Sequence, residues 1–233
     1  MCTLVPVSVF PICSLFRFTS VHGDFADVCR PLASSLRSPA CDRLEAVIDP
    51  RSSLLASARE AVALVGPSVP AHDDFVAALE AHGAAALDRE GPPAHLTASL
   101  FVFDSTGEQI LLCLHGKGRF WVQPGGHLEA GDTSLAQAAA RELEEETGVS
   151  CGLLRDVRVV DLDHHPLSSR FGRCASHLDV GVAAVVDRDA VALQVSDESD
   201  DLAWFPLDDL PSPLPPAFDE RLARVRAAYA VAR

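Results

Sequence analysis

The spacing of apolar residues divides the chain into a helical first part and a mixed second part. Between residues 45 and 65, apolar side chains recur at helical spacing until Gly66-Pro67 ends the pattern. A second helical run follows at 73–87, and the turn-forming sequence Asp-Arg-Glu-Gly-Pro-Pro comes after it. We therefore expect residues 45–91 to form a helical N-terminal region and residues 92–233 to form the main domain.

From residue 92 onward the periodicity changes from helical to extended and then mixes the two. Apolar runs separated by turn residues predict strands, and two stretches keep helical spacing. The predicted strands are 95–104, 108–115, 120–122, 155–163, 177–186 and 202–205, and the predicted helices are 135–147 and 218–231. Because strands and helices do not alternate strictly, we expect an α/β or α+β sandwich with a mixed sheet.

The first 44 residues fit neither part. The segment MCTLVPVSVFPICSLF is apolar, but it lacks a charged start, and Pro6 and Pro11 interrupt it. Its ~16 residues also fall short of the ~20 that a membrane-spanning helix needs. Met1 is the only methionine, so the true start could lie elsewhere. We expect residues 1–44 to be a weakly structured extension or a mis-assigned start, and the protein to be cytoplasmic.

Composition and charge disfavour several classes of protein. Apolar residues make up 48% of the 233-residue chain, which excludes disorder throughout. The formal net charge of −14 repels nucleic-acid backbones and anionic lipid, so general nucleic-acid or membrane binding is not expected. A phosphorylated small molecule remains compatible with this charge where divalent cations lie between carboxylates and phosphates. The seven cysteines contain no C-x-x-C pair, which disfavours a thiolate zinc site.

Three glutamates on the predicted helix 135–147 lie where a helix normally buries apolar side chains. The apolar stripe of that helix begins at Leu135, and helical spacing makes Glu142, Glu145 and Glu146 continue it. They also lie toward the negative C-terminal end of the helix, where burial and the helix dipole both disfavour anions. A cation is therefore expected to offset their charge.

Two neighbouring features favour a binding site over the alternative, a charged and solvated helix surface. The Gly125-Gly126 pair upstream allows backbone carbonyls to approach a ligand or metal closely. Arg141 adjoins the glutamates and is suited to orient a carboxylate. The acidic run alone is typical of a solvated surface, so the prediction depends on the combination.

The sequence Gly-Gly-His-Leu-Glu-Ala-Gly-Asp at 125–132 and the sequence Arg-Glu-Leu-Glu-Glu-Glu-Thr-Gly-Val at 141–149 together resemble the signature of the Nudix hydrolase family. The second segment fits the family's R-E-apolar-x-E-E-x-G-apolar pattern at every defined position. Two departures occur: Asp132 stands where the family usually has Glu, and one extra residue separates it from Arg141. Asp132 is therefore either a member of the site or a turn or helix-cap residue.

The resemblance implies a fold, a reaction and a set of site residues. The wider pattern W-x-Q-P-G-G-H-x-E-x-G-D-x-S-L resembles a bacterial subgroup, and the element order suits the family's α/β/α sandwich. The implied reaction is hydrolysis of a diphosphate linkage in a nucleoside-diphosphate-type small molecule with Mg²⁺ or Mn²⁺. The implied metal ligands are Glu142, Glu145, Glu146 and the Gly125 carbonyl, and Arg141 would orient the carboxylates. Hard oxygen ligands on one helix face independently favour Mg²⁺ over zinc.

The general base and the substrate contacts stay open at this stage. Glu145 or Glu146 could act as the base, and so could a group from a separate loop. The other candidate bases are His164, His165, His177 and the acidic segment 197–201. Lys117, Arg119 and His127 are the candidate substrate contacts, the first two through its phosphates. Each also has an ordinary alternative, since isolated histidines and cations are commonly surface or packing residues.

Two other functions for the same domain are weighed against hydrolysis. The first is a catalytically inactive module that binds a nucleotide as a sensor or regulator. The complete set of three glutamates disfavours it, whereas Asp132 and the longer spacing favour it. The second, isomerisation of an isoprenoid diphosphate, would need a Cys/Glu acid-base pair for which the sequence offers no clear candidate. Whether the domain forms a homodimer is left open.

Overall fold

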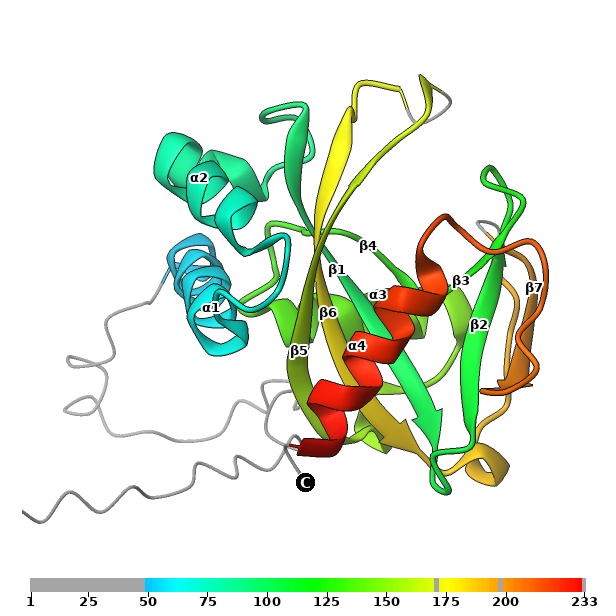
Figure 1. Ribbon diagram of the computed structural model, residues 1–233. Helices are drawn as coiled ribbons and strands as arrows, with labels where there is room; N and C mark the ends of the chain where they lie inside the picture. Colours follow the sequence, from blue (N-terminus) through cyan, green and yellow to red (C-terminus); the bar gives the residue numbers. More distant parts are fainter. Residues whose placement is uncertain (1–48, 170–171, 197–198, 232–233) are drawn as a thin grey trace, which may run out of the picture.

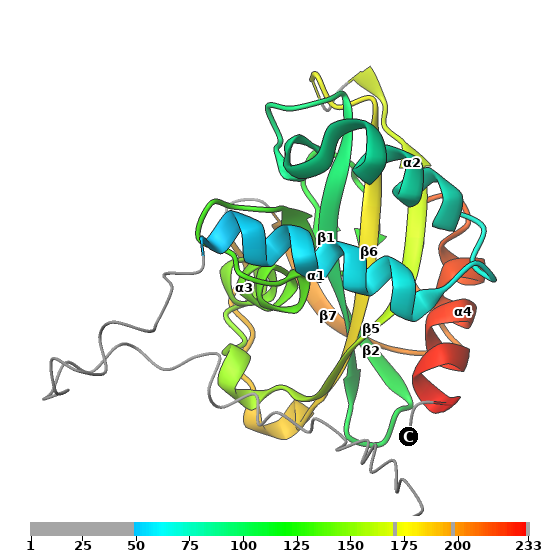
Figure 2. The ribbon, with the colours of Figure 1, turned by 90° about the vertical axis from the view of Figure 1, so that its left-hand side faces the viewer.

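A seven-stranded sheet lies between two helical layers in the computed structural model, which describes residues 49–169, 172–196 and 199–231 (Figure 1). The helices are α1 (Pro50–Val65), α2 (His72–His82), α3 (Leu135–Thr147) and α4 (Phe218–Val231). The strands are β1 (Ala94–Asp104), β2 (Gln109–His115), β3 (Trp121–Val122), β4 (Gly125–His127), β5 (Arg155–Pro166), β6 (Ser176–Val186) and β7 (Ser199–Pro206). Helices α3 and α4 lie on opposite sides of the sheet (Figure 2). The extension predicted at residues 1–44 falls outside the described ranges.

The sheet mixes parallel and antiparallel strands. Neighbouring strands pair in the order β3-β2-β1-β6-β5, with β7 on β2 and β4 on β1. Strands β1 and β6 run parallel, from the pair Ala94↔Ser176 to the pair Asp104↔Val186, and the other pairs are antiparallel. The α/β/α sandwich with a mixed sheet that the sequence predicts is therefore confirmed.

Successive residues of β1 point to opposite faces of the sheet, and each face has its own apolar cluster. Leu96, Ala98 and Leu100 face the cluster that includes side chains of α1 and α3. Phe101 and Phe103 face a second cluster, which side chains of α4 complete. All five β1 side chains are at most 4% exposed, so β1 is the central strand of both halves of the core.

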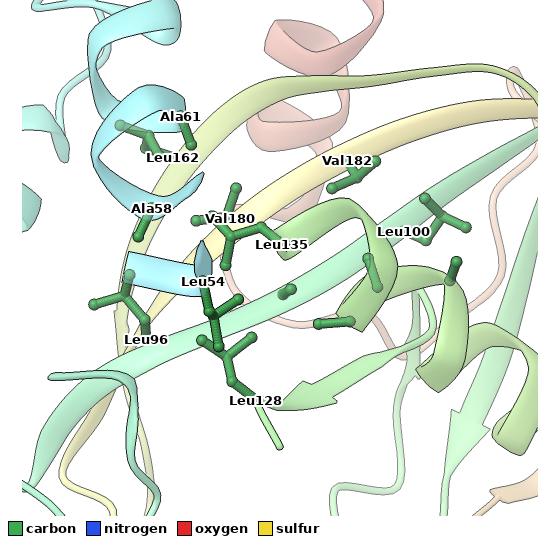
Figure 3. Close-up of a cluster of buried hydrophobic side chains, with 14 of the residues drawn as sticks. Leu54, Ala58, Ala61, Leu96, Leu100, Leu128, Leu135, Leu162, Val180 and Val182 are labelled. Carbon is green, nitrogen blue, oxygen red and sulfur yellow. The ribbon is translucent and has the colours of Figure 1, made fainter. Parts of the chain in front are cut away.

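Helix α1 belongs to the same apolar cluster as α3 and β6. Its Leu54 lies beside Leu135 and Val180 in that cluster (Figure 3). The Ser57 hydroxyl accepts a hydrogen bond from the backbone N–H of Leu135 at 3.1 Å. Helix α1 thereby satisfies one of the free donors at the start of α3. The described part of the helical region predicted at 45–91, from residue 49 onward, therefore packs on the α3 face of the sheet.

Most predicted elements are present, with different bounds in several cases: the first helix begins at Pro50, β5 extends to Pro166, and β7 begins at Ser199. Helices α3 and α4 have the predicted bounds. The helix predicted at 73–87 ends at His82, because the backbone of Gly83 turns with a φ of 53°, and a 3₁₀ helix continues to Leu87. The Gly125-Gly126 pair, for which no strand is predicted, begins a short strand, β4, which pairs with β1. None of the helices in the described ranges is long and apolar enough to cross a membrane.

Both ends of α3, the helix that carries the predicted site, have suitable capping residues. The Ser134 hydroxyl accepts a hydrogen bond from the backbone N–H of Gln137 at 3.1 Å. The Gln137 side-chain oxygen accepts a hydrogen bond from the backbone N–H of Thr133 at 2.8 Å. In a capping box it would accept from the backbone N–H of Ser134 instead. At the C-terminal end, Gly148 adopts the left-handed conformation, with φ 72° and ψ 2°.

Replacing Ser134 by Ala should lower the free energy of unfolding by ~1 kcal/mol, because the N–H of Gln137 loses its acceptor. Urea denaturation followed by circular dichroism measures the change. Ser150→Ala is the matched control, since Ser150 precedes a 3₁₀ helix without a side-chain cap hydrogen bond. It should stay within ~0.5 kcal/mol of wild type. Equal losses in the two variants would contradict the capping role.

Candidate functional site

Strand β4 brings two adjacent glycines into close contact with β1 on one side and α3 on the other. A Cβ atom on Gly125 would lie 2.5 Å from the Ser99 Cβ. A Cβ atom on Gly126 would lie 2.7 Å from the carboxylate carbon of Glu142. Only glycine leaves room for both approaches. The backbone of β4 therefore packs directly against a carboxylate of α3.

Two of the three glutamates predicted from the motif, Glu142 and Glu146, lie at this contact. The Glu142 side chain is 13% exposed. The Glu146 carboxylate accepts hydrogen bonds from the backbone N–H of Gly125 at 3.3 Å and from the Cys113 thiol at 3.6 Å. Glu145 is more open, with 56% of its side chain exposed. Glu142 and Glu146 thus contact the β4 backbone directly, and Glu145 joins them through Arg141.

The guanidinium of Arg141 joins these acidic side chains. It donates to Glu142 and to Glu145 at 2.9 Å each, and to both oxygens of Asp132 at 3.2 and 3.0 Å. It also donates to the backbone carbonyl of His127 at 2.9 Å. Burial by itself would lower the pKa of Arg141, but the hydrogen bonds and charges of Asp132 and Glu142 raise it above its usual value. Arg141 is therefore a permanent cation that orients two α3 carboxylates relative to β4.

Asp132 combines the two roles that the sequence leaves as alternatives. Its buried carboxylate accepts a hydrogen bond from the backbone N–H of Glu129 at 2.8 Å, which closes the turn between β4 and α3. The same carboxylate forms the two-pronged ion pair with Arg141. Despite the extra residue before α3, Asp132 therefore contacts the site through Arg141.

The ring of His127, a predicted substrate contact, lies in a cluster of histidines. Its centroid is 5.2 Å from that of His95 and 5.0 Å from that of His177. Burial, followed by the charge of Arg89, lowers the pKa of His127 to about 4, and burial lowers that of His177 to about 3 although the charge of Asp179 opposes the shift. Both rings are therefore neutral at neutral pH. The backbone carbonyl of His127 therefore accepts a hydrogen bond from Arg141, while its ring packs against the other two histidines.

Lys117 and Arg119, the other predicted substrate contacts, are exposed in the loop between β2 and β3. Arg119 forms an ion pair with Asp200 at the start of β7. The loop is thereby linked to β7, and both cations remain accessible from solvent.

The acidic segment 197–201 approaches the glutamates at one point. Asp197 and Glu198 lie outside the described residues, whereas Ser199 hydrogen-bonds to the Cys113 thiol. That thiol also contacts Glu146 at 3.6 Å. Burial, together with the charge of Glu146, raises the pKa of the thiol. The start of β7 therefore lies near the Glu146 side of the site.

The remaining histidine candidates are held by other groups. His164 bonds to Asp74 of α2 at 2.8 Å and to Ser176 at 2.9 Å. His165 bonds to Asp163 of its own strand at 2.9 Å. These contacts fix both rings on the β5–β6 part of the sheet rather than on α3.

A buried ion network on the α4 face was not predicted from the sequence. Arg221, with 7% of its side chain exposed, pairs with Asp161 at 2.9 Å and with Asp179 at 2.8 Å. Thr97 and Ser99 of β1 donate to the Asp179 carboxylate at 2.8 and 2.5 Å. The sequence does contain a signal for this network, because Asp161 and Asp179 each lie within an apolar strand. A buried carboxylate needs a partner, so a cation beside them could have been expected.

Three known proteins match parts of the chain. Octanoyltransferase of Myxococcus xanthus is 43% identical over 79 residues, which cover 32% of this chain and 20% of that protein. The putative mutator protein MutT4 of Mycobacterium tuberculosis is 34% identical over 122 residues, which cover 47% of this chain and 42% of that protein. Phosphatase NudJ of Escherichia coli is 62% identical over 53 residues, which cover 18% of this chain and 34% of that protein. The chain thus spans between a fifth and about two fifths of the length of these relatives.

A solved structure and a family model match a larger part of the chain. A solved structure of a C. elegans Ap4A hydrolase is 19% identical, with a TM-score of 0.48, and the match covers 58% of this chain and 98% of that chain. The model of the NUDIX domain family matches residues 93–229, which is more than half of the chain. That match begins beside the predicted start of the main domain and includes the β4 glycines and the acidic part of α3. The chain therefore belongs to the NUDIX domain family.

Proposed function

We propose that the protein hydrolyses a diphosphate linkage in a nucleoside-diphosphate-type small molecule, with Mg²⁺ or Mn²⁺ as cofactor. The observation that carries this proposal is the packing of Glu142 and Glu146 against the Gly125-Gly126 backbone. Arg141 joins Glu142 to Glu145 in the same group. Membership of the NUDIX domain family supports the proposal.

The acidic side chains fit a divalent metal by their chemistry and their charge. Asp132, Glu142 and Glu145 share the single guanidinium of Arg141, so one positive charge faces three negative ones. Carboxylate and carbonyl oxygens are hard donors, the type that Mg²⁺ and Mn²⁺ bind. The residues that would hold the ion are Glu142, Glu145, Glu146 and Gly125 through its carbonyl. When bound, such an ion neutralises diphosphate charge and lowers the pKa of a water molecule.

The protein itself supplies orientation and a proton acceptor. Asp132 fixes Arg141, and Arg141 fixes two carboxylates of α3. Glu145 is our first candidate for the general base, because it is more exposed than Glu142 and can reach a water molecule from solvent. The acidic segment 197–201 is the second candidate, because its Ser199 approaches the Glu146 side of the site.

Lys117 and Arg119 are proposed to contact the phosphates of the substrate. Their loop directly follows β2, whose Cys113 contacts Glu146. Both cations are exposed and can approach an anionic ligand. The ion pair of Arg119 with Asp200 is also exposed, so exchanging it for a phosphate contact costs little free energy.

A product-release assay over a substrate panel tests this function. The panel contains nucleoside triphosphates, nucleotide sugars, dinucleoside polyphosphates and nucleotide coenzymes, each with Mg²⁺, with Mn²⁺ and with excess chelator. We expect at least one member to be hydrolysed, and only with metal. Absence of product from every member, together with tight nucleotide binding in calorimetry that Mg²⁺ does not alter, would instead support a nucleotide sensor.

A further inference from the structure

We propose that His95, His127, Cys174 and His177 form a four-ligand zinc site. The four side chains come from β1, β4, the segment just before β6, and β6. One ligand atom from each side chain lies within 4.8 Å of the ligand atoms of all the others. The residues and their nitrogen and sulfur donors differ from the oxygen donors of the α3 glutamates.

His95 presents a nitrogen that is ready to bind a metal. Its Nδ1 lies 2.9 Å from the carbonyl oxygen of Pro92. Because a carbonyl can only accept, Nδ1 carries the proton in the neutral ring, and the lone pair is then on Nε2. The side chain is 1% exposed, and Nε2 is buried without a hydrogen-bond partner. A histidine whose second nitrogen is fixed by a carbonyl is typical of metal sites.

His177 adds a second nitrogen of the same kind. Its Nε2 is also buried without a hydrogen-bond partner, and its ring centroid lies 5.3 Å from that of His95. A buried polar atom without a partner costs free energy, so two of them in one cluster call for a specific reason. A zinc ion that accepts both lone pairs provides that reason.

The distances suit a tetrahedral ion. The Cys174 Sγ and His127 Nε2 atoms are 3.7 Å apart. Zinc bonds of ~2.0–2.1 Å to nitrogen and ~2.3 Å to sulfur place tetrahedral ligand atoms ~3.3–3.6 Å apart. The three rings form a nearly equal-sided triangle, with centroids 5.0, 5.2 and 5.3 Å apart. Side-chain movements of about 1 Å, within ordinary thermal amplitudes, bring the wider pairs to that spacing.

The backbone holds the ligands in this arrangement. His95 and His177 are register partners in the parallel pair of β1 and β6, and His127 lies on β4, the other neighbour of this part of β1. The backbone N–H of Ala175 donates to the Pro93 carbonyl at 2.8 Å, which holds the cysteine beside the start of β1. Ligands that are already in place reduce the entropic cost of binding an ion.

The donor set selects zinc and predicts a structural role. Imidazole nitrogen and thiolate sulfur favour zinc over Mg²⁺. On binding, the Cys174 thiol would lose its proton to solvent, and one thiolate with three neutral imidazoles would surround the ion. Four protein ligands leave no open position for water or substrate, as in structural zinc sites.

The location of the site explains what such an ion would stabilise. His127 contributes its ring to the cluster, and its carbonyl accepts a hydrogen bond from Arg141. Zinc would therefore hold β4, the strand of the two glycines, in place against the guanidinium that orients the glutamates. In this assignment His127 is a positioning residue rather than the substrate contact expected from the sequence.

Metal analysis of the untagged full-length protein, purified from zinc-supplemented cells, tests the proposal. We expect one zinc ion per chain after extensive dialysis. Replacing zinc by Co²⁺ should give the visible absorption of a tetrahedral ion and a thiolate-to-metal charge-transfer band. Cys174→Ser should abolish that band and weaken zinc binding by at least ~10-fold. A wild-type protein that retains no zinc and gives no such cobalt spectrum would overturn the proposal.

Two further variants separate this site from its neighbours. His165→Gln alters a histidine whose ring lies 5.7 Å from His177 but whose Nδ1 is bonded to Asp163, and it should keep the zinc. Glu146→Gln changes the α3 site and should also keep it. Loss of zinc from Glu146→Gln, with full retention in Cys174→Ser, would place the ion on the glutamates and overturn the proposal. If Cys174→Ser does not fold, the wild-type cobalt spectrum decides, because its charge-transfer band requires a thiolate.

Discussion

Glu146→Gln is expected to lower the metal-dependent hydrolysis rate by ~100-fold or more. The amide keeps the size of the side chain and its contact with the Gly125 N–H, which lies 3.3 Å away, but it removes the negative charge. A bound divalent ion contributes several kcal/mol to such a reaction, and each ~1.4 kcal/mol corresponds to a factor of ten in rate. The measurement is kcat, together with its dependence on Mg²⁺ concentration, for the substrate that the panel identifies.

Glu144→Gln is the matched control for this change. Glu144 lies on the same helix but is exposed, and its carboxylate contacts the backbone N–H of Cys151 at 3.4 Å. We expect this variant to keep the wild-type rate and Mg²⁺ dependence. If both glutamine variants lost activity equally, the effect would come from the charge of the helix as a whole and the assignment of Glu146 would be wrong.

Replacing Arg221 by Met should lower the free energy of unfolding by ~3–5 kcal/mol, because a buried charge loses its partner. Arg221 pairs with Asp161 at 2.9 Å and Asp179 at 2.8 Å, and both carboxylates are almost completely buried. Methionine fills a similar volume but leaves those carboxylates with less positive charge. Urea denaturation followed by tryptophan fluorescence measures the change.

Arg173→Met provides the control for Arg221→Met. The pair of Arg173 with Glu90 is largely exposed, with side chains 74% and 79% accessible, so its removal should cost less than ~1 kcal/mol. The deficit of Arg221→Met should also shrink as the pH is lowered. Burial already raises the pKa of Asp161 above its usual value, and loss of the Arg221 charge would raise it further, so proton uptake at low pH would stabilise the folded variant. A loss as small as that of Arg173→Met, or one that does not change with pH, would contradict the role of the network.

Local signals in the sequence were sufficient to predict α3 and α4. In α3, the apolar stripe that begins at Leu135 lies between a capping Ser134 and a terminal Gly148, and all of these signals lie within a few residues of each other. The strand β4 could not be predicted in this way. Its three residues have no strand pattern of their own and are extended because they pair with β1, far away in the sequence.

The difference between local signals and contacts between distant segments also explains which parts of the candidate site were predictable. Arg141 and the three glutamates lie within one helix, so their spacing alone places them on related faces. The role of Asp132 became visible only from its contacts with Glu129 and Arg141. The histidine and cysteine cluster draws its members from four separate segments. Among the four, only Cys174 and His177 have a local metal-ligand spacing, C-x-x-H, and one such pair supplies two of the four ligands that a zinc site needs.

Hydrolysis in ¹⁸O-labelled water is the measurement that tests the proposed function most directly. The panel substrates are incubated with Mg²⁺ and either wild-type protein or Glu146→Gln, and the products are analysed by mass spectrometry. With the wild type, we predict that one of the two phosphate products carries a single ¹⁸O atom. Chelation of the metal should abolish the labelled product, and Glu146→Gln should form it ~100-fold more slowly. Complete recovery of every unlabelled nucleotide from the wild-type reaction would contradict the assignment of the α3 glutamates to diphosphate hydrolysis.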